Sequence, residues 1–238
     1  NDDNYFKRKM FEYFWLKIPT RKAVYVTAIS EATKRDIIRF TRCLPEKIVV
    51  IPVAVPEIFK PFTKPFNDLC PVLLQIGTAS NKNLERVIRA IENITCQLVI
   101  IGKLDDHQQN LLKEYKINFK NHYNITLEQI YNQYVESDIV TFISTFEGFG
   151  MPIIEANCVE RPVITGNTSS MPEVGANAAC YVDPYSVEEI RNGINKLIQD
   201  KEYRNHLIEQ GRQNRKRYSG RQISLQYYEL YRKIWERN

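Results

Sequence analysis

The stretch Phe146–Asn157, FEGFGMPIIEAN, carries two carboxylates eight residues apart, Glu147 and Glu155. It follows a strand-like apolar run, turns through two glycines and enters a helix behind Pro152. Proline suits the first position of a helix because its missing N–H would have no intrahelical partner there. The pattern therefore predicts one acid on a loop and a second acid just inside the helix that follows.

The start of this helix predicts an anion site. No Ser, Thr, Asp or Asn stands at the expected N-cap, so no side chain obviously claims the first-turn amides. Free amides bind anions there, helped by the positive end of the helix dipole. Glu155 lies three residues after Pro152, about 4.5 Å further along the helix axis. Helical side chains lean toward the N-terminus, so the Glu155 carboxylate should reach back toward the first-turn amides. We expect a phosphate-bearing ligand with hydroxyl groups near Glu155.

A second anion-binding pattern lies upstream, in the loop Gly77–Asn83, GTASNKN, between a strand-like run and a helix. The helix dipole disfavours a lysine at a helix start, so Lys82 indicates an anionic partner. On the evidence of this loop alone, Lys82 is equally well explained as an ordinary surface lysine and as an anion-binding one. The loop lacks GxxxxGK[ST] and is not a Walker loop, and the absence of GxGxxG weighs against a nicotinamide enzyme.

An anion cradle combined with two carboxylates indicates a sugar nucleotide. A glycosidase also uses paired acids, but it has no use for a phosphate clamp. In a sugar nucleotide the diphosphate is the leaving group, and Lys82 and the amides after Gly148 can stabilise its charge. A carboxylate accepts two vicinal hydroxyl protons well, which suits Glu155 to a ribose and Glu147 to the transferred sugar. The alternative for Glu155 is an ordinary first-turn glutamate, which the helix dipole favours. The alternative for Glu147 is a solvated acid on a loop.

The segments around these loops alternate between strand and helix patterns. Near-continuous apolar runs occur at residues 72–77, 97–102, 117–120, 138–143, 162–165 and 179–184. Helical patterns follow at residues 83–92, 105–115, 127–136 and 187–200. This alternation predicts an α/β fold with a doubly wound, Rossmann-like parallel sheet covered on both faces. Ligands of such sheets bind beyond the carboxyl ends of the strands, where both loops described above lie.

The two ends of the chain look different from this middle part. Two short strand patterns, 23–29 and 47–52, surround a helix that opens at Ser30, and the proline-rich segment 53–71 predicts a linker. Before them runs an apolar stripe at helical spacing, which Pro19 should end. The stripe consists of Phe6, Met10, Phe11, Phe14, Trp15 and Ile18. We expect it to pack on a neighbouring domain, with a membrane-surface helix as the alternative.

Composition excludes several classes of protein. With 238 residues, 43% of them hydrophobic and 26% charged, the chain is typical of a globular protein. No apolar run approaches the roughly 18 residues of a membrane span, and the polar N-terminus predicts no signal peptide. The scattered cysteines indicate reduced, mostly buried thiols in a cytosolic protein. The basic run in residues 204–221 predicts a solvated helical face, because no nucleic-acid-binding module accompanies it.

Taken together, these motifs resemble the donor-binding half of a retaining GT-B glycosyltransferase of family 4, the glycosyl transferases group 1. Four local matches occur in the order typical of the family. They are SEAT (Ser30–Thr33), GTASNKN (Gly77–Asn83), EGFGMPIIEA (Glu147–Ala156) and SSMPEVGANAACYVDP (Ser169–Pro184). Glu-x7-Glu alone would be a weak pattern, but with EGFG inside it and the other motifs around it the resemblance is specific.

The resemblance implies a role for each matching position. Lys82 would hold the diphosphate, with backbone amides of residues 149–151 around the phosphate and sugar. Glu147 would contact the transferred sugar, Glu155 the ribose, and the loop 122–125 would lie by the base. The donor-binding set is Gly77, Thr78, Lys82, Tyr123, Asn124, Glu147, Gly148, Phe149, Gly150, Met151 and Glu155, with Glu147 and Lys82 as catalytic residues.

Two positions, Thr78 and Glu173, are not expected to contact the donor as charged residues of the family's site would. Thr78 stands where the family often has an arginine, so we expect Lys82 to act with amides and hydroxyls alone. Glu173 is expected to be structural and to cap the loop that it ends. No Asp-x-Asp cluster is placed to hold a metal, and we expect the nucleotide sugar to be a substrate with no cofactor beside it.

GT-B enzymes place their acceptor site on an N-terminal domain, which faces the donor domain across a cleft. We therefore predict that residues 1–22 are a helix and linker from the tail of a missing acceptor domain. Residues 23–220 would form the nucleotide-sugar-binding domain, and residues 221–238 a C-terminal helix that packs back on the missing domain. That domain would belong to the same enzyme or to a separate chain.

The resulting hypothesis is transfer of a hexose from a nucleotide diphosphate sugar to an acceptor, with retention of configuration. The alternative is a non-catalytic nucleotide-sugar-binding subunit that needs a partner chain for activity. We expect a cytoplasmic protein, peripheral on the inner face of a membrane if the aromatic stripe binds lipid, and we expect no binding to nucleic acid.

Overall fold

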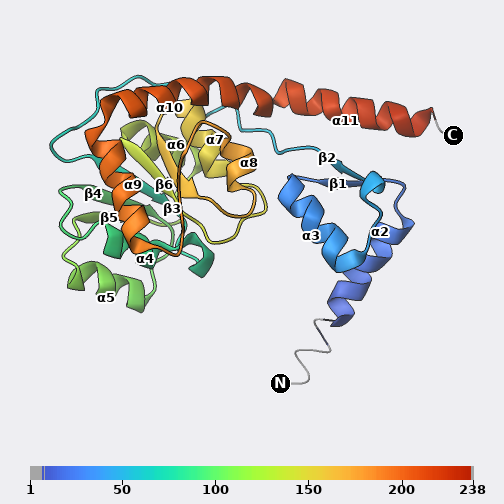
Figure 1. The fold of residues 1–238 in the computed structure, drawn as a ribbon, viewed down its shortest axis with the longest axis horizontal. Coiled ribbons are helices and arrows are strands. Elements are labelled where there is room, and N and C mark those ends of the chain that lie inside the picture. The colour runs from blue at the N-terminus through green and yellow to red at the C-terminus, as the bar shows by residue number, and fades with distance from the viewer. Residues whose placement is uncertain (1–6, 8, 237–238) are drawn as a thin grey trace.

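The structure is a computed structural model that describes residue 7 and residues 9–236. The chain forms a small N lobe, residues 12–50, and a larger sheet lobe, residues 72–218 (Figure 1). A segment without helix or strand, residues 51–71, connects the two lobes. Phe6, the first member of the predicted apolar stripe, lies outside the described residues.

The sheet lobe is built on six strands. They are β3 (Val72–Ile76), β4 (Gln97–Ile101), β5 (Phe119–His122), β6 (Ile139–Phe142), β7 (Val163–Gly166) and β8 (Cys180–Val182). Their order is β5-β4-β3-β6-β7-β8, and all neighbours are parallel. The chain therefore starts in the middle, winds out to β5, and returns to wind the other way. This order confirms the predicted doubly wound parallel sheet.

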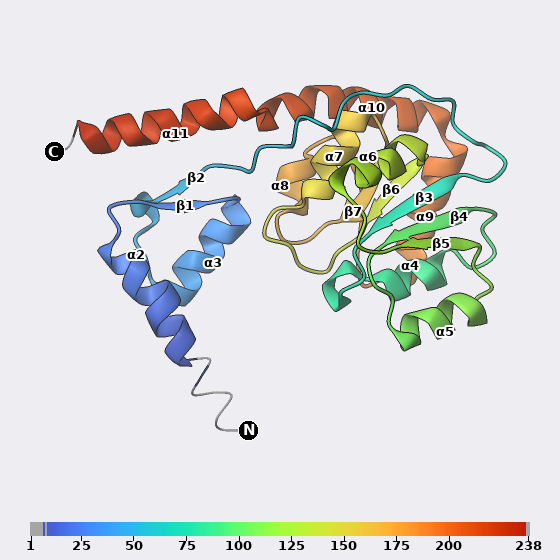
Figure 2. The ribbon, with the colours of Figure 1, turned by 180° about the vertical axis from the view of Figure 1, so that it is seen from behind.

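Helices cover both faces of this sheet (Figure 2). They are α4 (Leu84–Ala90), α5 (Asp106–Glu114), α6 (Leu127–Glu136), α7 (Met151–Val159), α8 (Met171–Gly175), α9 (Val187–Gln199) and α10 (Lys201–Asn214). Buried residues of α4, α5 and α9 form one apolar cluster with the strands, and those of α6, α7 and α8 form another.

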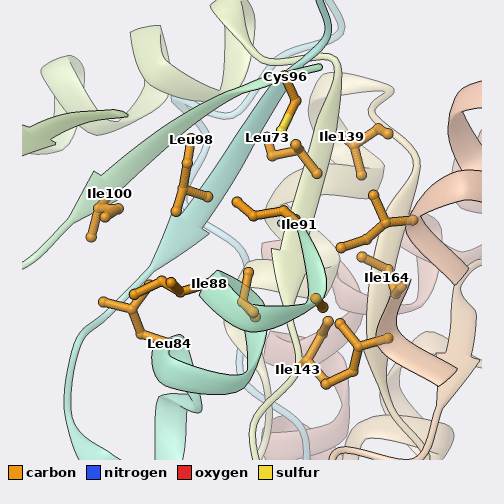
Figure 3. Close-up of a cluster of buried hydrophobic side chains, with 14 of the residues drawn as sticks. Leu73, Leu84, Ile88, Ile91, Cys96, Leu98, Ile100, Ile139, Ile143 and Ile164 are labelled. Carbon is orange, nitrogen blue, oxygen red and sulfur yellow. The ribbon is translucent and has the colours of Figure 1, made fainter. Parts of the chain in front are cut away.

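Alternation along each strand supplies both clusters. Leu73 and Leu98 belong to the cluster with α4, which Figure 3 shows, while Leu74 and Val99 belong to the cluster with α7. All four side chains are at most 4% exposed. Because successive strand residues point to opposite faces, a sheet covered on both sides needs an unbroken apolar run. That requirement explains why the strands were recognisable in the sequence.

The N lobe has a sheet of its own. It contains the π-helical segment η1 (Glu12–Lys17), α2 (Ile18–Lys22), β1 (Val26–Ala28), α3 (Glu31–Thr41), the 3-10 turn η2 (Pro45–Lys47) and β2 (Ile48–Val50). Strands β1 and β2 pair in parallel with each other and do not join the six-stranded sheet. The predicted domain boundary at residue 23 is therefore not where the two sheets divide; the division falls in the segment 51–71.

Pro19 does not end the first helix, which continues to Lys22. Pro19 directly follows the π-helical turns of η1, at the second position of α2. A π-helical turn shifts the register of the hydrogen bonds, so the missing N–H of proline is tolerated there. The prediction failed because it assumed α-helical hydrogen bonding before the proline, where the structure has π-helical turns.

The last helix, α11 (Gly220–Trp235), extends from the sheet lobe along the N lobe (Figure 1). Its buried Ile223 and Leu230 pack with Ile51 at the end of β2. A short 3-10 segment, η4 (Arg215–Tyr218), joins it to α10. Residues 204–221 are not a uniformly solvated basic face: the Arg204 side chain is buried and donates to the Leu197 carbonyl.

Two other sequence predictions can be compared with the structure. The five cysteines are free and all except Cys70 are buried, as expected for reduced thiols. Burial raises the pKa of the Cys96 thiol to about 12 and that of the Cys158 thiol to about 11, so both stay protonated at neutral pH. Within the part of the chain that the structure describes, no helix combines the length and the apolar character needed to cross a membrane.

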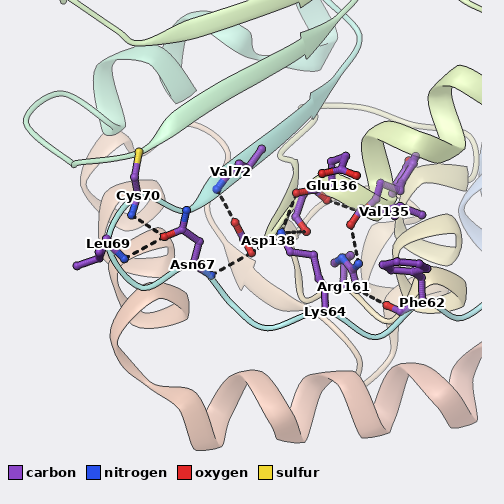
Figure 4. A network of polar contacts seen from close by, with 12 residues as sticks. Phe62, Lys64, Asn67, Leu69, Cys70, Val72, Val135, Glu136, Asp138 and Arg161 are labelled. Atoms are coloured by element: carbon purple, nitrogen blue, oxygen red, sulfur yellow. Dashed lines mark hydrogen bonds and ion pairs between the residues drawn. The ribbon is translucent and has the colours of Figure 1, made fainter.

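Buried Asp138 fastens the connecting segment to the sheet (Figure 4). Its Oδ2 accepts the Val72 backbone N–H at 2.8 Å, at the first residue of β3. Its Oδ1 accepts the Asn67 backbone N–H at 3.2 Å and pairs with Lys64 Nζ at 2.8 Å. A single carboxylate thus satisfies two backbone amides and one ammonium group of the segment that leads into β3.

Replacing Asp138 with alanine should lower the free energy of unfolding by about 3 kcal/mol, because two backbone amides lose their acceptor and Lys64 keeps only backbone carbonyls as partners. Urea denaturation followed by circular dichroism measures this change. The matched control is Asp106→Ala on the exposed first turn of α5, which should cost no more than about 1 kcal/mol. Equal losses in the two variants would contradict the role assigned to Asp138.

Candidate functional site

The site lies where the winding of the sheet reverses. Strands β3 and β6 are hydrogen-bonded neighbours, but the helices that follow them, α4 and α7, pack on opposite faces. The loops leaving these two strands diverge, and such a divergence opens a crevice beyond the carboxyl ends of the strands. Lys82 belongs to the loop after β3, and Glu147 belongs to the loop after β6.

Lys82 and Glu147 form an ion pair across this crevice. Lys82 Nζ lies 2.6 Å from Glu147 Oε1, and the side chains are 24% and 14% exposed. The ammonium group also lies 4.9 Å from the ring centroid of Phe142. Asn81 Nδ2 donates to the same carboxylate oxygen at 3.2 Å. The structure therefore brings together the two residues to which the sequence assigned catalytic roles.

The loop after β3 is shaped to hold Lys82 in this position. Gly77 has φ +88°, and a Cβ atom there would lie 2.8 Å from Lys82 Cγ. Thr78 Oγ1 donates to the Lys103 carbonyl at 2.6 Å, so this hydroxyl fastens the loop to its neighbour. Asn83 caps α4 with φ 62°, and its Nδ2 donates to the Pro184 carbonyl at 2.6 Å. Lys82 thus extends from a loop that is held at both ends.

The start of α7 is the place where the sequence predicts an anion site. Its N-cap is Gly150, with φ 112°, and no side chain caps the helix. The first helical residue is Met151 and Pro152 is the second, one position later than the sequence suggested. No hydrogen bond found among the described residues uses the backbone N–H of Gly148, Phe149 or Gly150. Three successive amides, which directly follow Glu147 in the chain, thus have no hydrogen-bond partner among the described residues.

Glu155 lies apart from this pair, one turn into α7. The Tyr134 hydroxyl of α6 donates to Glu155 Oε2 at 2.5 Å, and the Tyr134 side chain is fully buried. Burial raises the pKa of the Glu155 carboxyl group, and the hydrogen bond from Tyr134 partly offsets this increase. The structure therefore separates the two acids, Glu147 with a cation and Glu155 with a neutral hydroxyl.

Tyr123 and Asn124 are the predicted site residues that the structure does not bring to this cluster. They follow β5, the edge strand, which is separated from β3 by β4. Tyr123 is 55% exposed, and Asn124 has φ 55°. Their assignment to the base of the ligand stays a prediction.

Sequence reasoning missed several polar residues that hold the site. Ser169 and Ser170 both donate to the Glu147 carbonyl, and Asn81 and Tyr134 contact the two acids. The two serines stand in the SSMPEV motif, which could have suggested them. Tyr134 gave no signal, because a buried aromatic residue on a helix face is usually part of the core.

Glu173 has a different structural role from the predicted one. Its carboxylate accepts the backbone N–H of Glu31 at 2.8 and 2.9 Å and that of Ala32 at 3.3 Å. Glu173 therefore caps the start of α3 in the N lobe rather than its own loop. The negative carboxylate suits the positive end of the α3 dipole, which was not foreseeable before the two lobes were seen together.

Gly77→Ala should destabilise the protein by about 2 kcal/mol, because the new Cβ atom needs an unfavourable φ and collides with the Lys82 side chain. Gly220→Ala is the matched control, since a Cβ atom at Gly220 would have no neighbour within 4 Å. That variant should be neutral or slightly stabilising, as alanine favours a helix. Urea denaturation compares the two, and a neutral Gly77→Ala variant would contradict the close packing of Lys82 on Gly77.

Comparison with known proteins supports a relationship with sugar-transferring enzymes. The family model described as glycosyl transferases group 1 matches residues 58–214. O-antigen chain mannosyltransferase B of Escherichia coli is 31% identical over 99 residues, which are 42% of this chain and 26% of that protein. The chain spans 26%, 49% and 56% of three curated relatives, about half of their length or less.

Solved structures share the fold. A glycosyltransferase from Rickettsia africae superposes with a TM-score of 0.81 at 21% identity, covering 96% of this chain and 68% of that one. Anabaena HepE, solved in complex with UDP and glucose, gives a TM-score of 0.78 at 19% identity, covering 93% and 66%. The family model spans both loops that form the Lys82–Glu147 pair and all six strands of the larger sheet, and the chain therefore belongs to the glycosyl transferases group 1.

Proposed function

We propose that this chain is the donor-binding half of a retaining glycosyltransferase that takes a hexose from a nucleoside diphosphate sugar. The observation that carries this proposal is the Lys82–Glu147 pair at the reversal of the sheet, next to free amides at the start of α7. Family membership supports transfer of a sugar. Retention of configuration rests on the resemblance to family 4, and the reaction is proposed to need no metal.

Lys82 and the α7 amides suit the diphosphate. A ligand phosphate would take over the Lys82 ammonium group from Glu147, and it would accept hydrogen bonds from amides that are otherwise unused. The same groups would stabilise the charge that develops on the diphosphate as it leaves. Glu147, released from Lys82, would then accept hydrogen bonds from hydroxyl groups of the transferred sugar.

Glu155 suits the ribose because only one of its oxygens is occupied. Tyr134 donates to Oε2, and among the described residues no other hydrogen bond reaches this carboxylate. Oε1 is left to accept the ribose hydroxyls. The Tyr134 hydrogen bond fixes the rotation of the carboxyl group, which favours recognition of a rigid diol.

The names of relatives narrow the first donors to test. All three curated relatives are described as mannosyltransferases, and HepE was solved with UDP and glucose. We therefore propose a hexose, with mannose as the first sugar to test and both GDP and UDP as carriers. Both bases are included because the predicted base loop follows β5, which β4 separates from β3.

The acceptor side is proposed to come from an additional unit that docks on the N lobe. A two-stranded sheet is too small to be stable alone, and β1 has a free edge. Aromatic residues of η1 are exposed beside it, with Phe14 57% and Trp15 73% exposed. An acceptor-binding domain that extends this sheet would cover them. Binding of the chain alone to anionic vesicles would instead support a cytoplasmic protein held at the membrane surface.

Calorimetric titration with UDP, GDP and ADP in the presence of EDTA tests the donor site. At least one should bind, and Lys82→Ala should weaken that binding by at least about tenfold, because a charged hydrogen bond is lost. Lys113→Ala, an exposed lysine in the last turn of α5, is the matched control and should change nothing. Failure of all three nucleotides to bind the wild-type chain would reject the proposal. Restoration of sugar transfer by a separate acceptor-binding half would favour the enzyme, and binding with no transfer even in its presence would favour the non-catalytic subunit.

Glu155→Gln should stabilise the protein at neutral pH while it weakens nucleotide binding. The pKa of Glu155 is raised in the folded state, so its ionisation above that pKa costs folding free energy. Removing the charge should therefore raise stability by about 1 kcal/mol near pH 7, and the gain should vanish at acidic pH, where Glu155 is protonated in both states. Thermal unfolding between pH 4 and pH 8 measures this difference, and a variant that is less stable at pH 8 than at pH 4, relative to wild type, would contradict it.

A further inference from the structure

The N lobe contacts the Glu147 loop through two hydroxyl groups at the start of α3. Ser30 Oγ donates to the Gly148 carbonyl at 2.7 Å, and Thr33 Oγ1 donates to the same oxygen at 3.0 Å. Gly148 directly follows Glu147 and is more than 100 residues away from both hydroxyls in the sequence. The Ser30 side chain is fully buried. Neither residue has been given a role in the proposed donor site.

Hydroxyl groups hold each carbonyl of three successive residues in this loop. The carbonyl of Glu147 accepts from Ser169 and Ser170, and that of Phe149 accepts from Ser170. The Gly148 carbonyl between them is the one held from the other lobe, by Ser30 and Thr33 of α3. The orientation of all three peptide planes is therefore set by side chains from distant segments.

A fixed carbonyl also fixes the amide of the next residue. No described peptide bond is cis, and in a trans peptide the C=O of one residue and the N–H of the next point in opposite directions. With the Gly148 carbonyl turned toward α3, the Phe149 N–H must point away from α3. That N–H is one of the amides that no hydrogen bond among the described residues uses.

The start of α3 is itself held in place. Ser30 caps the helix by accepting the Thr33 backbone N–H at 3.0 Å. Glu173, which follows the two loop serines, accepts the Glu31 and Ala32 amides. The Gly148 backbone packs at contact distance on α3, since a Cβ atom there would lie 3.7 Å from Thr33 Oγ1. Hydrogen bonds from the hydroxyls of α3 and from Ser169 and Ser170 thus hold the Glu147 loop from two different segments.

We propose that Ser30 and Thr33 are positioning residues for the donor site, which hold the Phe149 amide toward the β-phosphate of the nucleotide. This inference rests on the proposed function, because it presupposes a nucleoside diphosphate at the start of α7. It adds that the N lobe is part of the donor site. Separation of α3 from the sheet lobe would release the Gly148–Phe149 peptide and weaken the hold on the diphosphate.

The test compares a nucleoside diphosphate with the corresponding monophosphate, using whichever base the wild-type chain binds. Ser30→Ala combined with Thr33→Val should weaken binding of the diphosphate by at least about tenfold, while binding of the monophosphate stays within about twofold. Thr33→Ser, which keeps the hydroxyl, should bind both ligands like wild type. Ser219→Ala removes the N-cap of α11 and controls for the loss of a helix cap.

The outcomes separate the two levels of the proposal. If the wild-type chain binds neither ligand, the proposed function itself fails. If wild type binds both and the double variant loses both equally, Ser30 and Thr33 are merely structural and the inference is wrong. Unchanged binding of the diphosphate would overturn it as well. Should the double variant fail to fold, Thr33→Val alone gives the same comparison, because Thr33 is not the helix cap.

Discussion

The reversal of winding between β3 and β6 is the constraint on which the site depends. Each strand must bury both of its faces, and the helices that follow the two strands pack on opposite sides. Neither helix can then cover the end of the sheet where the strands meet. Polar residues can be tolerated there, and the Lys82–Glu147 pair occupies this place. The same topological requirement that builds the core therefore leaves room for a ligand.

The strands, the helices and the two loops that carry Lys82 and Glu147 could be predicted because their signals are local, whereas the ion pair between these two residues was not predicted. Apolar runs such as Val72–Ile76 must be continuous in a parallel sheet, and Lys82 and Glu147 stand in loops whose place follows from strand order. Tyr134 and Ser30 could not be predicted as site residues, because their importance depends on partners 21 and 118 residues away in sequence. The pairing of β1 with β2 was missed for the same reason.

Polar side chains at several places in the chain join distant backbone segments by hydrogen bonds. Asp138 holds the segment that leads into β3, Asn83 joins the loops after β3 and β8, and Glu173 caps a helix of the other lobe. A buried backbone amide or carbonyl needs a partner, and loops lack the regular partners of helices and strands. Side chains supply those partners, so the loops around the site are held by specific hydrogen bonds although they contain little regular structure.

Under the proposed function, the ion pair between Lys82 and Glu147 would also set a cost for binding an anion. The ammonium group already has an anionic partner at 2.6 Å. A small anion such as free phosphate must displace that partner and leaves the carboxylate without compensation, which makes its binding weak. A sugar nucleotide brings both a replacement anion for Lys82 and hydroxyl groups for Glu147. A nucleoside diphosphate without its sugar carries the same cost but keeps its contacts through the nucleoside, so under the proposed function it should bind, only more weakly than the complete sugar nucleotide.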